Sequence, residues 1–179
     1  MAVRKKSETI HLRVRPFSKA LLEGLANSTG KTSTQLIEEL ITEAASKFSI
    51  EAIPELINIA VLRDGQLDLK TVVESAHVEH DAILTKLRTF YIAQSSLSLR
   101  DRIIASTIID SPELFSGNSE IFAVEDEIVK PEFISSTPKL DLHEITRRMP
   151  SLEDFAAFRE KNPGWKSTYK DFLKMIGED

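Results

Sequence analysis

Polar and apolar side chains alternate between Glu8 and Pro16, and this period of two predicts a short β-strand. Its apolar face would consist of Ile10, Leu12 and Val14. Its polar face would consist of Thr9, His11, Arg13 and Arg15. We expect the strand to stop at Pro16, because proline has no N–H for a β-ladder and suits the first turn of a helix.

After Pro16 the apolar period becomes that of α-helices. A first helix is expected from Pro16 to Asn27, with Gly30 closing it in the left-handed conformation. Its apolar stripe consists of Phe17, Leu21, Leu22, Leu25 and Ala26. A second helix is expected from Thr32, which has capping-box spacing to Gln35. Its wider stripe consists of Leu36, Ile37, Leu40, Ile41, Ala44, Ala45 and Phe48.

So short a unit cannot bury this much apolar surface alone, and an identical copy is the simplest partner. Pairing two copies strand to strand would turn the apolar face into a core and present the polar face twice. A two-stranded ribbon of that width fits the major groove of DNA. The pattern therefore predicts a mainly α-helical protein with an antiparallel ribbon between two subunits.

Charge is distributed unevenly along the chain. The net charge is −5, but residues 1–19 carry six basic residues against Glu8 alone, so the other 160 residues sum to −10. The basic residues are Arg4, Lys5, Lys6, Arg13, Arg15 and Lys19. A basic arm that leads into such a strand is placed to contact DNA phosphates.

Residues 8–48 resemble the ribbon-helix-helix family, which includes the Arc and MetJ repressors and many plasmid and antitoxin regulators. The resemblance rests on the alternating strand, the Pro16 helix start, the Gly30-Lys31-Thr32 turn and the apolar second helix, and it covers under a quarter of the chain. It implies base contacts by Thr9, His11 and Arg13. It implies phosphate contacts by Arg4, Lys5, Lys6, Arg15, Lys31, Thr32 and Ser33. The implied dimer core consists of Ile10, Leu12, Val14, Leu36, Ile37, Leu40, Ile41 and Ala44.

Two features add to these assignments. Arginine pairs bidentately with guanine, which favours Arg13 as a base contact. The first turn of the second helix offers backbone N–H groups to an anion. His11 departs from the Asn, Thr, Lys or Gln that is more usual in the middle of the family's strand.

Residues 50–110 are expected to form a small helical bundle. Helices are predicted over 50–62, 69–94 and 97–109, with a turn at 63–66. Residues 71–88 also resemble a helix-turn-helix, which would be a second DNA-contacting motif, but a continuous amphipathic helix is favoured. Glu74, His77 and His80 would have metal-ligand spacing on that helix; a solvated face is the preferred interpretation, and no metal or other cofactor is expected.

The segment Asp110–Glu144 carries nine acidic and two basic residues and several prolines. This composition predicts an acidic connector over 111–150 that could contact another protein. One short strand is expected within it, at Ile121–Val124. Ser151 starts a predicted helix that ends at Asn162, and Trp165 precedes a last helix. The predicted domains are therefore 1–49, 50–110, 111–150 and 151–179.

Composition limits the function further. The chain has no cysteine, which excludes disulfides and thiolate sites and fits a cytoplasmic protein. No apolar run approaches the roughly 20 residues of a membrane span, so no membrane association is expected. The sequence has no Walker loop, dinucleotide-binding turn or nucleophile elbow, so we do not expect this protein to be an enzyme.

The favoured hypothesis is a homodimeric transcriptional regulator that binds a pseudo-palindromic site in double-stranded DNA, and the resemblance suggests control of plasmid or mobile-element transfer genes. One alternative is an antitoxin that represses its own promoter and neutralises a toxin through its C-terminal region. Another is an interaction module that pairs two subunits without touching nucleic acid.

Overall fold

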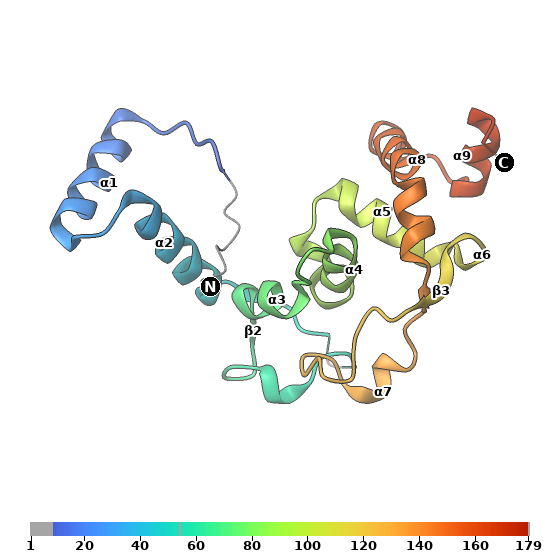
Figure 1. Ribbon diagram of the computed structural model, residues 1–179, viewed down its shortest axis with the longest axis horizontal. Helices are drawn as coiled ribbons and strands as arrows, with labels where there is room; N and C mark the ends of the chain where they lie inside the picture. The colour runs from blue at the N-terminus through green and yellow to red at the C-terminus, as the bar shows by residue number, and fades with distance from the viewer. Residues whose placement is uncertain (1–8, 54, 179) are drawn as a thin grey trace, which may run out of the picture. The chain divides into compact units, whose positions relative to one another are not determined.

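The computed structural model describes residues 9–53 and 55–178, and the chain is mainly α-helical, as predicted (Figure 1). It divides into two compact units, Met1–Ala44 and Ala45–Asp179. Predicted contacts by Arg4, Lys5 and Lys6 lie outside the described residues.

The first unit contains helix α1 (Pro16–Thr29) and all but the last three residues of helix α2 (Ser33–Lys47). Pro16 occupies the first turn of α1, where its missing N–H costs no hydrogen bond. Gly30 closes α1 with a φ of 68°, and its N–H donates to the carbonyl oxygen of Ala26. These observations confirm the predicted start and cap of the first helix. The helix runs to Thr29, two residues beyond the predicted end at Asn27.

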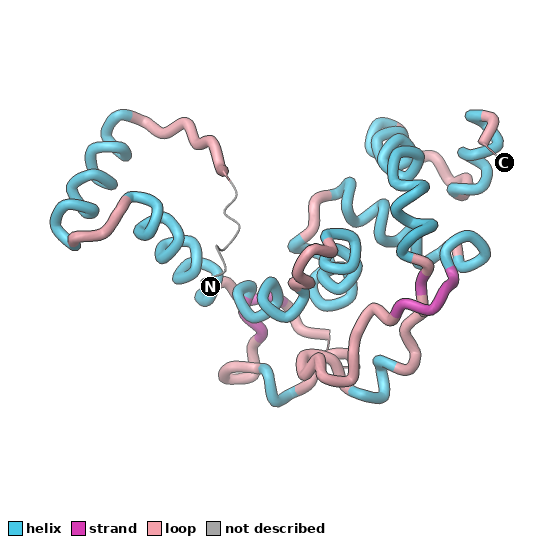
Figure 2. The backbone as a smooth tube through the Cα atoms, viewed as in Figure 1, coloured by secondary structure: helices cyan, strands magenta, loops and turns pink. Residues whose placement is uncertain are grey.

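Residues 9–15 precede α1 as a loop in the single chain (Figure 2). They form no β-ladder with any other described residue. The predicted ribbon is a pairing between two chains, so a strand here would need a second copy to supply its hydrogen bonds.

The second unit contains a short antiparallel pair, β1 (Ser49–Ile50) and β2 (Leu67–Asp68). Ile50 pairs with Leu67, and both side chains are buried. The chain between the strands holds a 3₁₀ turn, η1 (Ile59–Val61), and a tight turn over 63–66. The predicted helix over 50–62 is therefore wrong, because Ile50 pairs with Leu67 and Ile57 bridges to Val129. The predicted turn at 63–66 is confirmed.

Two helices, α3 (Leu69–Ala76) and α4 (Ala82–Ala93), replace the single helix predicted over 69–94. Asp81 caps α4 by accepting the N–H of Leu84 at 2.8 Å. His80, just before it, has a φ of 66°, in the left-handed region that a continuing helix cannot use. The helix-turn-helix alternative therefore gave the correct break.

A second 3₁₀ turn, η2 (Gln94–Ser96), leads to α5 (Leu99–Asp110), which lies close to the helix predicted over 97–109. Ser98 caps α5 by accepting the N–H of Asp101 at 3.1 Å. The buried residues of α5 are Ile104, Ala105, Thr107 and Ile108.

The acidic segment folds as part of the second unit. It contains α6 (Pro112–Phe115), β3 (Ser116–Ser119) and α7 (Pro131–Ile134). The strand predicted at 121–124 is wrong, because β3 lies earlier, where Gly117 donates its N–H to Lys139 at 3.0 Å. The backbone of the segment also bonds to residues 56–58, since the Asn58 N–H donates to Ile128 at 2.9 Å.

The C-terminal helices are α8 (Leu142–Lys161) and α9 (Tyr169–Ile176). Helix α8 starts nine residues before the predicted Ser151, because Asp141 caps it by accepting the N–H of Glu144 at 3.0 Å. Pro150 lies inside α8. A proline there costs about 3 kcal/mol, and burial of Ile145 and Leu152 on either side offsets that cost. The predicted end of the helix at Asn162 is confirmed.

One hydrophobic core unites the second unit. It includes Leu87 of α4, Phe122 of the acidic segment and Leu152 of α8, all at most 1% exposed. Residues 50–110, 111–150 and 151–179 therefore share a core, and the acidic segment is not the extended connector that its composition suggested.

Candidate nucleic-acid interface

The predicted base-contacting residues lie on the surface of the first unit. Thr9, His11 and Arg13 are exposed, and Arg15 next to them is exposed as well. Arg15 is the residue before α1 and has extended backbone angles, φ −65° and ψ 150°. All four side chains are thus free of the protein interior and accessible to a ligand.

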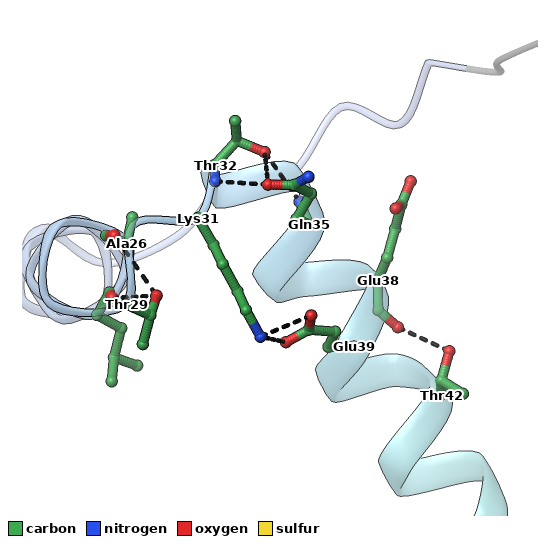
Figure 3. A network of polar contacts seen from close by, with 9 residues as sticks. Ala26, Thr29, Lys31, Thr32, Gln35, Glu38, Glu39 and Thr42 are labelled. Carbon is green, nitrogen blue, oxygen red and sulfur yellow. Dashed lines mark hydrogen bonds and ion pairs between the residues drawn. The ribbon is translucent and has the colours of Figure 1, made fainter.

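The turn between α1 and α2 is organised by a capping box (Figure 3). The backbone N–H of Thr32 donates to Oε1 of Gln35 at 2.9 Å, and the Gln35 N–H donates to Oγ1 of Thr32 at 3.2 Å. The first helical hydrogen bond runs from Leu36 N–H to the Thr32 carbonyl at 3.1 Å. The box confirms the predicted helix start, and it commits the Thr32 hydroxyl to the helix rather than to a ligand.

Ser33 lies in the first turn of α2 and is half-buried. Because the earliest N–H groups of a helix have no intrahelical acceptor, the backbone at Ser33 is suited to an anion. Phosphate contact at Ser33 stays a prediction.

Lys31 does not point its charge at that turn. Its Nζ lies 2.6 and 2.8 Å from the two carboxylate oxygens of Glu39. Glu39 is six residues after the first residue of α2, so the ion pair joins the turn to the second turn of the helix rather than to its first. The pairing, between residues eight apart, was not predicted from the sequence.

A large apolar surface covers the first unit. Eight large hydrophobic side chains within residues 10–41 are 49–73% exposed. They are Ile10, Leu12, Val14, Phe17, Leu21, Leu25, Leu40 and Ile41, and we call them the apolar face of residues 10–41. In the described part of this unit only Leu36 is buried. So many exposed large apolar side chains in one small unit indicate an interaction site.

Most residues of the predicted dimer core lie on this face, and Ala44 is exposed nearby. Leu36 is instead buried within the chain, and Ile37 is half-buried. Phe17, Leu21 and Leu25 of α1 extend the face, although the sequence analysis did not assign them to the dimer core. Their helical spacing was the signal that could have done so.

Helix α4 is the second helix of the helix-turn-helix alternative considered for residues 71–88. Leu87, Thr89 and Ile92 of α4 are buried, so the helix belongs to the core. Its exposed edge lines a groove of about 350 Å³ between α4, α5 and α8. Both basic residues of α4 are paired with carboxylates: Lys86 with Asp101 at 2.6 Å, and Arg88 with Asp126 at 2.8 Å.

The metal-ligand spacing considered for Glu74, His77 and His80 is not formed, because α3 ends at Ala76. Among the described residues, no group of three His, Cys, Asp or Glu residues is arranged to hold a metal ion. None of the helices described has an apolar run long enough to cross a lipid bilayer.

Comparison with protein-family models, with curated proteins and with solved structures finds no match for this chain.

Proposed function

We propose that this chain is a homodimeric, sequence-specific DNA-binding transcriptional regulator. Its N-terminal unit would form a ribbon-helix-helix dimer whose antiparallel ribbon lies in the major groove. The observation that carries the proposal is the apolar face of residues 10–41, which has no counterpart to cover it in the described part of its own unit. The resemblance to plasmid regulators suggests transfer genes of a plasmid or mobile element as targets.

A second copy explains the positions of the exposed apolar residues. In a ribbon formed by two copies, strand alternation turns Ile10, Leu12 and Val14 toward the helices. The exposed residues of α1 and α2 then supply the rest of a shared core. Burying such side chains contributes about 25 cal/mol for each Å² removed from water, which an isolated unit with one buried residue cannot obtain.

The same pairing explains the polar residues. Thr9, His11 and Arg13 would face outward, twice over, about a two-fold axis, which matches a pseudo-palindromic DNA site. Arg15 and the backbone at Ser33 would contact phosphates on either side of the ribbon.

The fold of residues 45–179 supports a regulator over an antitoxin. A toxin-neutralising tail is expected to be short and disordered until its partner binds. Here the acidic segment instead contributes Ile121, Phe122 and Leu140 to a common core. In the proposal this unit serves oligomer contacts, effector sensing or contact with polymerase.

Selection from a randomised duplex library tests the proposal directly. We expect the full chain to enrich a pseudo-palindromic site, and its affinity to fall about 10³-fold or more between 50 and 200 mM salt if about six phosphates are contacted. A chain that enriches no sequence and shows no salt-dependent binding would be an interaction module, and the proposal would be wrong.

Arg13→Ala, with Arg15→Ala as the matched control, then tests the contacting face. We expect Arg13→Ala to cost about 1–3 kcal/mol on the selected site and to relax base preference at one position. Arg15→Ala should weaken selected and random DNA alike, because phosphate contacts carry no sequence information. Wild-type binding by Arg13→Ala would show that the ribbon face is assigned wrongly.

A further inference from the structure

Lys31 is placed in the turn before α2, where a DNA-binding protein would use a cation to contact phosphate. Its ammonium is instead paired with the carboxylate of Glu39. Both carboxylate oxygens of Glu39 contact the Lys31 ammonium, at 2.6 and 2.8 Å (Figure 3). The two side chains remain 42% and 54% exposed, so the pair faces solvent and the ammonium can be reached by another anion.

The geometry sets Lys31 apart from the other cations near the predicted interface. Arg13 and Arg15 precede α1 and are exposed. Lys31 follows the α1 cap at Gly30 and extends along α2, away from the first turn of that helix. Glu39 therefore holds the one basic residue of the turn between α1 and α2 in an ion pair with a carboxylate.

We propose that Glu39 is an intramolecular competitor of DNA phosphate, and that Lys31 contacts the DNA backbone only by exchanging this carboxylate for a phosphate oxygen. The inference rests on the proposed function and concerns its regulation by charge. Because phosphates are the same in every sequence, the competition lowers the affinity for all duplexes equally and leaves base preference unchanged.

The size of the effect follows from the exposure of the pair. Solvent-exposed ion pairs contribute at most about 1 kcal/mol, so releasing Lys31 should tighten DNA binding by about two- to fivefold. The release should also steepen the salt dependence, because a phosphate contact then replaces an ion pair that salt itself weakens.

Glu39→Gln in the full chain tests the inference, with Glu38→Gln as the matched control. Both variants remove one negative charge from adjacent positions of α2, but the Glu38 side chain points away from Lys31 (Figure 3). We expect Glu39→Gln to bind selected and random duplexes about two- to fivefold more tightly than Glu38→Gln does, with the same ratio between the two DNAs.

A double-mutant cycle assigns the gain to Lys31. In a Lys31→Gln background, Glu39→Gln should bind DNA no more tightly than Glu38→Gln. Equal affinities of Glu39→Gln and Glu38→Gln in the wild-type background, or an equal gain without Lys31, would overturn the inference while leaving the proposed function standing. Failure of every variant, and of the wild type, to bind any duplex would overturn the proposed function itself.

Discussion

The guanidinium of Arg88 lies 2.8 Å from the carboxylate of Asp126, and this pair joins helix α4 to the acidic segment. The Arg88 Nε also donates to the carbonyl oxygen of Ile121 at 2.7 Å, and Asp126 accepts the N–H of Ala123 at 2.6 Å. The two charged side chains are only 11% and 21% exposed. The acidic segment, whose composition suggested a loose connector, is thus held to α4 by one largely buried arginine.

Arg88→Ala should destabilise the protein by about 2–4 kcal/mol, because it leaves the Asp126 carboxylate largely buried without its cation. Urea denaturation measures the loss. Lys139→Ala is the control, since Lys139 pairs with Glu120 at the same 2.8 Å but both side chains are about half exposed. Its cost should stay below about 1 kcal/mol. Equal costs for the two variants would show that the Arg88 contact does not organise the segment.

Gly117→Ala should also destabilise the protein, by about 2–3 kcal/mol or more. A Cβ at Gly117 would lie 2.5 Å from the backbone nitrogen of Asp141, and backbone in a paired segment cannot move aside cheaply. Gly164 has open space around the same position, so Gly164→Ala should change stability by no more than about 0.5 kcal/mol. Thermal melting of both variants measures the difference, and a harmless Gly117→Ala would contradict the close approach.

Leu40→Glu should convert the proposed dimer to a monomer, because a charge on the apolar face of residues 10–41 cannot be buried unpaired. Analytical ultracentrifugation of the full chain measures the change, and DNA binding should be lost with it. Ile59→Glu is the control, since Ile59 is 73% exposed but belongs to the second unit. A wild type that sediments as a monomer at micromolar concentration would contradict the prediction.

Glu144 gives the fold a dependence on acid pH. Hydrogen bonds from Arg147 and Arg148 lower the pKa of Glu144 from 4.5 to about 2. A carboxylate with a depressed pKa in the folded state stabilises it fully above pH 4.5, and this contribution is lost as the pH falls toward 2. The melting temperature of the wild type should therefore exceed that of Glu144→Gln at neutral pH, and the two should converge between pH 4.5 and 2. A gap that is constant over this range would contradict the assignment.

The features that the sequence predicted correctly depend on residues close together in the chain. The Gly30 cap, the Thr32–Gln35 capping box and the helix end at Asn162 each involve residues within four positions of one another. Their chemistry is local, so the sequence contains all of it. The alternation over residues 9–15 likewise fixes which side chains share a face once a strand forms.

The errors arose where distant residues decide the structure. A helix was predicted over 50–62, but Ile50 instead pairs with Leu67 in a small sheet. A helix boundary was predicted after Pro150, but this proline lies inside α8. At the candidate interface, Thr9, His11 and Arg13 are exposed, and their contact with bases stays a prediction. The pairing of Lys31 with Glu39 does not follow from helical spacing, because the side chains meet only through the path of the turn between α1 and α2.

By itself the sequence determined the helical character of the chain, the caps of its first two helices and the amphipathic pattern of its first fifty residues. Only the tertiary structure decided that Phe122 and Val129 of the acidic segment are buried, and that Leu36 of the first unit is buried whereas Leu40 and Ile41 stay exposed. The physical reason is that hydrogen-bond caps are satisfied by neighbours in the chain, whereas burial depends on which distant surfaces are available to exclude water.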